Sequence, residues 1–428
     1  MSERRVQAAK APLRARVRAV PSKSVTHRVL LAAALADSPS TLIDPLDADD
    51  TRATADGLAA LGIEVLRSSG EWEVRPRAGR VPGGGAIFLH GSGTSLRFLI
   101  ALAALGENPS RFDGSPRLRE RPTQELAHAL VRLGGRVRLG DAPGGLPLEV
   151  GGARPRGGAA TLPAGRSSQF ASALMLIGSR LPAGLDLSLE PPVVSLPYIE
   201  LSERVLVKFG ARVQRLDRRR WRVEPGGYRG QQVRIEGDHS SASYFLLAAA
   251  VRGGSVRVDG LEPESPQPDA RLRRILEDLG CAVRVGADWV EVECAGRIPG
   301  FEVDLTDAPD LAPTLAVLAL FAEGPSRLRG VAHLRLKESD RIEVLARNLE
   351  ALGRHVRVGE STLEIGGPQA PPRGSYRILT ASDHRIAMAF AVAGLRIDGI
   401  VVDDDTCVAK SNPGFWDQLA SLEGQIGA

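Results

Sequence analysis

The chain has 428 residues, of which 43% are hydrophobic and 25% are charged, as is typical of a globular protein with two or three domains. A formal net charge of +4 and a pI near 9.2 favour anionic ligands. Basic residues are spread along the chain and only 4% of residues are aromatic, so we expect small anions rather than nucleic acid. No apolar run is long enough for a membrane span, and the basic N-terminus lacks the apolar core of a secretory signal.

The three cysteines, Cys281, Cys294 and Cys407, show neither metal-ligand spacing nor a pairing pattern, so we expect a reducing, cytoplasmic environment. Of the 55 basic residues only five are lysines. Arginine cannot replace lysine where a compact charge or a proton carrier is needed. Three of the five lysines, Lys23, Lys337 and Lys410, fall within motifs described below.

A pattern of about 70–76 residues repeats along the chain. An apolar helix ends at a glycine in each repeat, and the glycines are Gly62, Gly134, Gly210, Gly280 and Gly353. Strand-like alternation follows each glycine, and one tryptophan-containing strand recurs at 71–74, 220–223 and 288–291. A sixth repeat would end near Gly424 and would take its strands from the N-terminus around Ala15–Val20. Both chain ends would then lie in one domain.

Each repeat also contains a second helix, whose predicted start is rich in capping residues. The six starts are Ser22-Lys23-Ser24, Gly91–Thr94, Ser167-Ser168-Gln169, Asp238–Ser241, Asp307–Asp310 and Ser382–Arg385. Helix capping explains the Ser, Thr and Asp residues, but it does not require nearby cations such as Lys23, Arg28, Arg97, His384 and Arg385. A cation at a helix N-terminus opposes the helix dipole, and a bound anion would relieve that penalty.

The segment from His333 to Arg341 is dense in ionisable groups and precedes an apolar helical pattern at 342–352. Ser339 is the predicted N-cap, which puts Lys337 and Glu338 at the mouth of this helix. A carboxylate held among cations there could transfer protons. Taken alone, the segment is explained better by a solvated, salt-bridged helix start.

The motifs taken together resemble those of the enolpyruvyl transferase family, in order and at compatible spacing over essentially the whole chain. The matching stretches are Ser22-Lys23-Ser24 with Arg28, Gly91–Arg97, Arg117–Pro122, Ser167–Phe170, Val194–Tyr198, Asp310, Lys337–Arg341, Asp383-His384-Arg385 and Lys410. Each motif alone is weak, but their joint occurrence is specific. Gly91 and His333 stand where the family usually has Asn, and Pro21 stands where it has Gly.

The resemblance implies an α/β fold of two similar domains, each of three repeated α/β units with helices inside and sheets outside, an inverse α/β barrel. Residues 1–20 and 237–428 would form one domain and residues 21–236 the other, joined by a double-crossover hinge. The active site would lie in the cleft between the domains. No metal and no organic cofactor is implied.

The resemblance also implies an activity, the transfer of the enolpyruvyl (carboxyvinyl) group of phosphoenolpyruvate to the 5-hydroxyl of shikimate 3-phosphate, with release of phosphate. Glu338, Asp310 and Lys23 would be catalytic. The implied phosphoenolpyruvate ligands are Lys23, Gly93, Arg121, Gln169, Arg341, Arg385 and Lys410. The implied shikimate 3-phosphate ligands are Lys23, Ser24, Arg28, Ser167, Ser168, Gln169, Ser195, Asp310, His333 and Lys337, with His384 in support.

Two alternatives stay open at this point. One is enolpyruvyl transfer to UDP-N-acetylglucosamine, but that branch typically has a cysteine in the loop that corresponds to 117–122, where this chain has none. The other is a non-enzymatic protein that binds a phosphate-rich polymer through the same basic groups. For the favoured activity we expect a monomeric cytoplasmic enzyme that binds neither nucleic acid nor membranes.

Overall fold

The structure is a computed structural model that describes residues 2–367 and 374–424. The chain forms two units, and it passes from one to the other twice. Residues Pro21–Ile235 form a continuous unit, and Met1–Val20 with Glu236–Ala428 form a discontinuous unit. Each unit has its own hydrophobic core.

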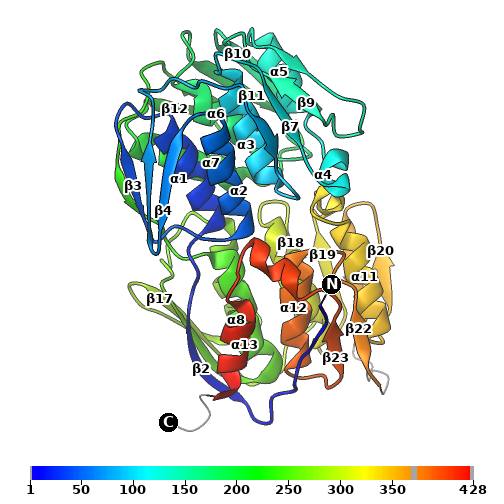
Figure 1. Cartoon of the computed structure of the whole chain (residues 1–428). Helices are drawn as coiled ribbons and strands as arrows, with labels where there is room; N and C mark the ends of the chain where they lie inside the picture. The colour runs from blue at the N-terminus through cyan, green and yellow to red at the C-terminus, as the bar shows by residue number, and fades with distance from the viewer. Residues whose placement is uncertain (1, 368–373, 425–428) are drawn as a thin grey trace. The chain divides into compact units, whose positions relative to one another are not determined.

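The continuous unit contains three four-stranded sheets and seven helices among the described residues (Figure 1). The sheets, in strand order, are β14(Gln232–Arg234)-β3(Ser40–Ile43)-β5(Glu71–Arg75)-β4(Glu64–Ser68), β6(Ala86–Phe88)-β7(Ser110–Asp113)-β9(Leu148–Val150)-β8(Val137–Arg138), and β10(Gly158–Pro163)-β11(Leu185–Glu190)-β13(Arg220–Val223)-β12(Val213–Asp217). The helices are α1(Lys23–Ala34), α2(Asp49–Ala60), α3(Gly93–Ala104), α4(Pro116–Glu120), α5(Gln124–Arg132), α6(Gln169–Gly178) and α7(Leu196–Lys208).

The discontinuous unit repeats this plan. Its sheets are β16(Ala282–Val285)-β17(Trp289–Cys294)-β15(Gly254–Asp259)-β2(Leu13–Arg18), β18(Glu302–Asp304)-β19(Ser326–Arg329)-β21(Thr362–Ile365)-β20(Val356–Val358), and β1(Arg4–Arg5)-β23(Ile400–Val402)-β22(Tyr376–Ile378). Its α-helices are α8(His239–Arg252), α9(Leu272–Asp278), α10(Ala312–Leu320), α11(Arg341–Ala351), α12(His384–Gly394) and α13(Phe415–Gly424). Its 3₁₀ helices are η1(Pro268–Arg271), η2(Pro309–Leu311), η3(Ala332–Leu336) and η4(Thr406–Lys410).

Three helices form the centre of each unit because they are apolar on nearly every face. In the continuous unit these are α1, α3 and α6, which contact one another and are buried over most of their length. In the discontinuous unit they are α8, α10 and α12. Amphipathic helices such as α5 and α11 pack one face against the central helices and expose the other. Helices are therefore inside and sheets outside, as expected.

The repeat predicted from the sequence is confirmed in its main features. The tryptophan-containing segments are β5, β13 and β17, and each has the same place in its sheet, between an antiparallel edge strand and a central strand. All five predicted helix-ending glycines have positive φ, between 84° and 96°. Glycine is the residue that adopts this conformation without a steric penalty.

The N-terminal strands were assigned to the wrong repeat. We expected Ala15–Val20 to complete the sixth repeat, but β2 pairs in parallel with β15 and so belongs to the fourth repeat. The sixth sheet is completed by β1, in which Arg4 and Arg5 pair with β23. A two-residue strand has no readable alternation, whereas Leu13 and Val17 of β2 point into the core and leave a clear signal.

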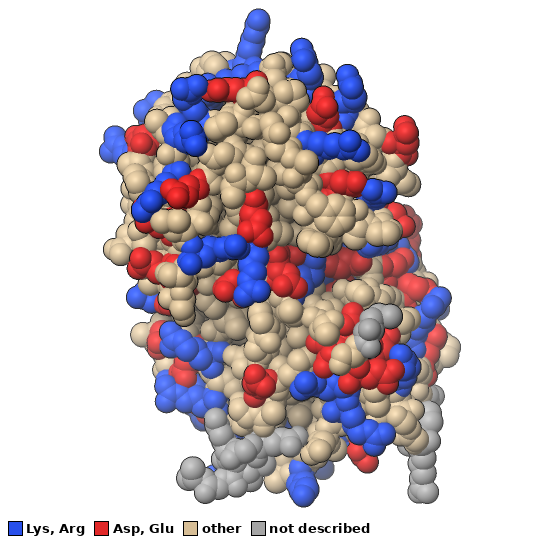
Figure 2. Space-filling view, in the orientation of Figure 1, with Lys and Arg blue, Asp and Glu red and all other residues tan. Residues whose placement is uncertain are grey.

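The outer faces of the sheets carry charges of both signs that pair across neighbouring strands. Arg222 of β13 bonds Asp186 of β11 at 2.6 Å, and Arg284 of β16 bonds Glu293 of β17 at 3.0 Å. Figure 2 shows basic and acidic side chains interspersed over the visible face. Among the described residues, no helix has the length and apolar character that a membrane span requires.

Two strand-starting glycines provide a matched test of the packing between strands. Gly158 and Gly254 both have φ near 100°, so alanine is strained at either position. An alanine methyl at 158 would meet no atom within 4 Å, whereas at 254 it would collide with the backbone of Leu13 in β2. We predict that Gly158→Ala costs about 1–2 kcal/mol and that Gly254→Ala costs at least about 2 kcal/mol more. Urea denaturation midpoints measure both, and equal shifts would contradict the β2–β15 pairing seen in the structure.

Candidate functional site

The central helices begin at the predicted motifs. Five of them start directly after their caps, at Lys23, Gly93, Gln169, His239 and His384. The sixth, α10, is preceded by the single turn η2, which carries Asp310. Side chains at these starts contact one another within each unit, so each unit holds its own cluster of motif residues.

In the continuous unit, hydrogen bonds link the starts of all three central helices. Arg97 of α3 donates to the amide oxygen of Gln169 of α6 at 2.6 Å, and Gln169 donates to Thr94 at 2.9 Å. Arg28 of α1 donates to Ser172 of α6 at 3.3 Å. The residues predicted from three distant motifs therefore surround one region.

Arg28 is buried there without a negative partner. Its guanidinium donates to Ser202 Oγ at 2.8 Å, to the Ser24 carbonyl at 2.8 Å and to the Tyr198 carbonyl at 2.9 Å. All its partners among the described residues are neutral, and burial lowers the pKa of Arg28 to about 10. A buried charge is expensive unless it is compensated, so the region is suited to a bound anion.

Half-buried Arg180 and buried Arg354 have a structural explanation that Arg28 lacks. Arg180 donates to the carbonyl of Leu35 at the C-terminus of α1, and Arg354 donates to the carbonyl of Leu320 at the end of α10. Cations at helix C-termini are stabilised by the helix dipole. Arg28 instead points back to the N-terminal turn of α1, where the dipole opposes it.

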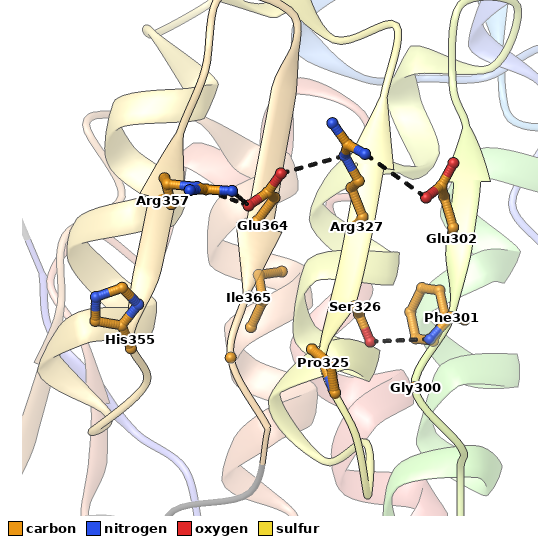
Figure 3. Close-up of a pocket in the computed structure, with 11 residues that line it drawn as sticks. Gly300, Phe301, Glu302, Pro325, Ser326, Arg327, His355, Arg357, Glu364 and Ile365 are labelled. Carbon is orange, nitrogen blue, oxygen red and sulfur yellow. Dashed lines mark hydrogen bonds and ion pairs between the residues drawn. The ribbon is translucent and has the colours of Figure 1, made fainter.

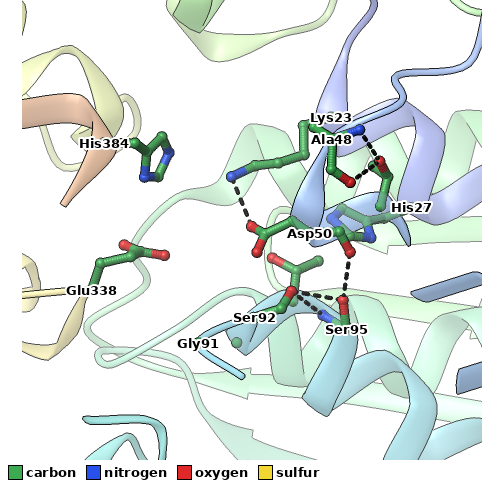
Figure 4. A network of polar contacts seen from close by, with 12 residues as sticks. Lys23, His27, Ala48, Asp50, Gly91, Ser92, Ser95, Glu338 and His384 are labelled. Carbon is green, nitrogen blue, oxygen red and sulfur yellow. Dashed lines mark hydrogen bonds and ion pairs between the residues drawn. The ribbon is translucent and has the colours of Figure 1, made fainter. Parts of the chain in front are cut away.

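Lys23 belongs to a buried polar network in the continuous unit (Figure 4). Its Nζ lies 3.0 Å from the Asp50 carboxylate, and both side chains are buried. The Asp50 carbonyl accepts from Ser95 Oγ at 3.0 Å, and Ser95 bonds Thr54 at 2.8 Å. Asp50 therefore ties Lys23 to the start of α3. Asp50 was not predicted as a site residue, although its place in the first turn of α2 could have marked it.

Gly93 lies against the guanidinium of Arg121. A methyl group added at Gly93 would meet Arg121 atoms at 2.6–2.8 Å, so only glycine lets this guanidinium lie over the helix start. Arg121 is buried, and its Nη1 lies 3.5 Å from the carbonyl of Gly91.

The predicted serines lie around the same region. Ser168 is the buried N-cap residue of α6, and Ser167 Oγ accepts from the Gln169 amide at 3.2 Å. Ser24 supplies a carbonyl to Arg28. Ser195 is buried and adopts a left-handed conformation with φ 57° and ψ 38°, which is uncommon for serine.

In the discontinuous unit, one buried arginine binds three carboxylates. Arg341 lies 2.8 Å from each of Asp310, Glu338 and Asp383, and its side chain is 1% exposed. Asp383 also accepts from Ser339 and from the Arg385 amide. This arrangement fixes Glu338 and Asp310 beside each other. Asp383, the N-cap of α12, was recognised only as part of a motif.

Asp310 is held between two arginines, because Arg385 binds its second oxygen at 2.8 Å. Burial alone would raise the pKa of Asp310, but Arg385 and Arg341 outweigh burial and hold that pKa well below its usual range. Asp310 is therefore a fixed anion and a weak base in the ligand-free protein.

The helix start after Lys337 and Glu338 differs by one residue from the prediction. The N-cap of α11 is Asp340, which accepts from the Glu343 amide at 3.1 Å, and not Ser339. Both residue types cap helices well, so the sequence alone does not separate them. The consequence for Lys337 and Glu338 is unchanged, since both lie before the helix.

The remaining predicted residues of this unit lie close to the same cluster. Burial, reinforced by Lys337, lowers the pKa of His333 to about 3, so its neutral imidazole can donate and accept hydrogen bonds as Asn does. His384 Nδ1 lies 3.8 Å from Asp383. Lys410 ends η4, which packs against α12.

A hollow on another part of the discontinuous unit is a weaker candidate (Figure 3). It lies over β18, β19, β20 and β21, and none of the residues predicted from the sequence lines it. Its charges pair with each other, since Arg327 bonds Glu364 at 3.3 Å and Arg357 bonds the same carboxylate at 2.6 Å. Across the described ranges, no group of three or more His, Cys, Asp or Glu residues could hold a metal ion.

A model of the EPSP synthase (3-phosphoshikimate 1-carboxyvinyltransferase) family matches residues 7–419. The chain belongs to the EPSP synthase family. It is 43% identical to the 3-phosphoshikimate 1-carboxyvinyltransferase of Methanoculleus marisnigri, over 95% of this chain and 96% of the relative. It is also 43% identical to the enzyme of that name from Syntrophobacter fumaroxidans, over 94% of this chain and 95% of that relative.

Solved structures agree with this family. An EPSP synthase from Acinetobacter baumannii superposes with a TM-score of 0.80 at 25% identity, covering 99% of this chain and 98% of that chain. The resemblance seen in the sequence and the predicted α/β fold class are confirmed.

Asp269 of η1 interacts with Asp310 of the discontinuous unit. It was not predicted from the sequence, because no motif surrounds it. It is buried and bonds Ser240 Oγ. Burial, with the charge of Asp310 adding to it, raises the pKa of Asp269 to about 7. An aspartate in an unfolded chain has a pKa near 3.9. The stability that this carboxyl contributes is therefore fully present below about pH 4 and is lost as the pH rises through 7.

We predict that Asp269→Asn, which cannot ionise, makes the thermal stability less dependent on pH. The fall in Tm between pH 5 and pH 8 should shrink by at least about 2 °C relative to the unmodified protein. Exposed Asp278 on α9 provides the control, and Asp278→Asn should keep the original slope. An unchanged slope in Asp269→Asn would show that Asp269 is ionised throughout this range.

Proposed function

We propose that the protein is a 3-phosphoshikimate 1-carboxyvinyltransferase. It transfers the carboxyvinyl group of phosphoenolpyruvate to the 5-hydroxyl of shikimate 3-phosphate and releases phosphate, a step of aromatic amino-acid biosynthesis. Family membership over residues 7–419 supports the activity. The observation that carries the proposal is Arg28, a buried cation at a helix start whose partners within the described part of the chain are all neutral, which suits it to a phosphate.

We propose that the continuous unit binds shikimate 3-phosphate mainly through its phosphate. Arg28 supplies the charge, and the hydroxyls of Ser24, Ser167, Ser168 and Ser195 supply hydrogen bonds, since hydroxyls can donate to phosphate oxygens. Gln169 is held by Arg97 and Thr94 and contacts both substrates. The other unit also binds the acceptor, through His333, Lys337 and Asp310. The neutral imidazole of His333 and the carboxylate of Asp310 contact the ring hydroxyls of shikimate 3-phosphate.

We propose that cations from both units bind phosphoenolpyruvate. Its carboxylate and phosphate carry the charges that guanidinium groups bind with two parallel hydrogen bonds. Arg121, held over Gly93, and Lys23 act from the continuous unit. Arg341, Arg385 and Lys410 act from the discontinuous unit, with His384 supporting their positions.

The proposed reaction needs two kinds of proton transfer. A proton adds to the methylene carbon of phosphoenolpyruvate while the acceptor oxygen forms a bond to C2. The former methylene carbon, now a methyl group, then loses a proton as phosphate leaves C2. Glu338 carries out both transfers at carbon. Arg341 at 2.8 Å fixes its orientation. General acid–base groups of this kind contribute about 10²–10⁴ to the rate.

Asp310 accepts the hydroxyl proton, with Lys23 as a second candidate. In the ligand-free protein Asp310 is a weak base because Arg341 and Arg385 hold it. When these arginines also bind the phosphoenolpyruvate anion, their charge is shared and the basicity of Asp310 rises. Substrate binding therefore activates the base. We also propose that the enzyme is a monomer in the cytoplasm that binds neither nucleic acid nor membranes.

Phosphate release tests the activity directly. Purified protein mixed with phosphoenolpyruvate and shikimate 3-phosphate should release inorganic phosphate, and replacing the acceptor by UDP-N-acetylglucosamine should abolish release. Turnover with the nucleotide sugar alone would support the sister activity. Absence of turnover, with polyphosphate binding that weakens steeply with salt, would support a polymer-binding protein instead.

We predict that Glu338→Gln lowers kcat by about two orders of magnitude or more while both substrates still bind, because the amide keeps the shape but cannot transfer a proton. Steady-state phosphate release and equilibrium binding measure the two effects. Glu343→Gln is the matched control, since exposed Glu343 on α11 pairs only with Arg347 among the described side chains. A near-normal kcat in Glu338→Gln would exclude Glu338 from proton transfer.

A further inference from the structure

Two cysteines that showed no pairing pattern in the sequence lie opposite each other in the discontinuous unit. Strands β16 and β17 are antiparallel, with Ala282 opposite Glu293 and Val283 opposite Val292. The same register continued by one residue puts Cys281 opposite Cys294. Side chains alternate along a strand, so both thiols lie on the face of Val283 and Val292, which packs into the core.

Cys281 and Cys294 form a non-hydrogen-bonded cross-strand pair, the more closely spaced of the two pair types in antiparallel sheets. The Cys281 amide donates to the carbonyl of Leu276 at 2.9 Å, so it does not donate to the backbone of Cys294. Such non-hydrogen-bonded pairs have Cα atoms about 4.5 Å apart. That separation lies within the range that disulfides span, roughly 4.4–6.8 Å. Both side chains are buried in the same hydrophobic core.

The surroundings distinguish the two sulfurs. The backbone amides of Ala295, Gly296 and Arg297 directly follow Cys294, in a turn where Gly296 has φ 76°. Successive amides arranged this way stabilise an anion. The Cys281 hydrogen bond, followed by these amides, lowers the pKa of Cys294 to about 6, and the pKa of Cys281 is raised.

We propose that Cys281 and Cys294 form a dithiol–disulfide site that peroxides close and thiol reductants reopen. The Cys294 thiolate attacks one oxygen of hydrogen peroxide, which gives a sulfenic acid and, after protonation, water. The Cys281 sulfur then attacks the Cys294 sulfur, and the sulfenic hydroxyl leaves as a second water. In sum, two thiols lose two electrons and two protons to one peroxide, and the disulfide joins edge strand β16 to β17.

Cys407 provides an internal control. It is half-buried in the same unit, its thiol donates to the Asp404 carbonyl at 3.1 Å, and burial raises the pKa of this thiol. It is therefore a thiol rather than a thiolate at neutral pH and should react slowly with peroxide.

Peptide mapping tests the proposal on the full chain. Reduced protein is exposed to a few equivalents of hydrogen peroxide, alkylated with N-ethylmaleimide in denaturant and digested with trypsin. Cleavage after arginine separates 275–284, which holds Cys281, from 285–297, which holds Cys294. We expect these two peptides joined by a disulfide that dithiothreitol reverses, with Cys407 still alkylated. Full alkylation of Cys281 and Cys294 after peroxide would overturn the proposal.

Single variants test the order of events. In Cys281→Ser, a sulfenic acid on Cys294 cannot be resolved, and dimedone should label Cys294. In Cys294→Ser, Cys281 should stay unlabelled and reduced. Labelling of Cys281 but not Cys294 in these variants would overturn the assignment of Cys294 as the attacking sulfur.

Discussion

The continuous unit holds positive charge at the positive end of a helix. Arg28 is buried near the start of α1, where neither a carboxylate of the described residues nor the helix dipole compensates it. Half-buried Arg180 and buried Arg354 show that the same fold can place arginines at helix C-termini, where the dipole favours them. The fold therefore keeps an unfavourable charge at the helix starts, and a bound phosphate makes that charge favourable.

The two units handle charge in different ways. Around Arg28, Arg97 and Gln169 of the continuous unit, the two guanidinium groups donate to neutral carbonyl, amide and hydroxyl oxygens, which suits an added anionic group. In the discontinuous unit, three carboxylates surround Arg341. This second arrangement is stable without a ligand and holds Glu338 in a defined orientation. We therefore propose that one unit serves chiefly for binding and the other for proton transfer as well as binding.

Much of the fold follows from short-range signals in the sequence. The helix starts were predictable because capping residues mark them, and the repeated strands because each contains a tryptophan between alternating residues. The two-residue strand β1 was not predictable, since pairing of Arg4 and Arg5 with β23 depends on residues almost 400 positions away. The choice between Ser339 and Asp340 as a cap depends on Asp383, which binds Ser339 from another helix.

The same distinction applies to the site. Residues within recognisable motifs, such as Lys23 and Glu338, could be named from the sequence, but their partners could not. Asp50 beside Lys23 and Asp269 beside Ser240 come from other elements and follow only from tertiary packing. The cysteine pair lies between these cases, because Cys281 and Cys294 are symmetric about the β16–β17 turn and a correct register would have paired them.

The affinity difference between shikimate 3-phosphate and shikimate tests the central claim most directly, since the two ligands differ only in the phosphate. Calorimetric titration should show that Arg28→Gln loses roughly 10- to 100-fold of the preference for the phosphorylated ligand, as expected for charge-assisted hydrogen bonds. Arg354→Gln, which removes a buried arginine at a helix C-terminus, should keep the full preference. An unchanged preference in Arg28→Gln would show that the buried charge at this helix start does not bind the phosphate.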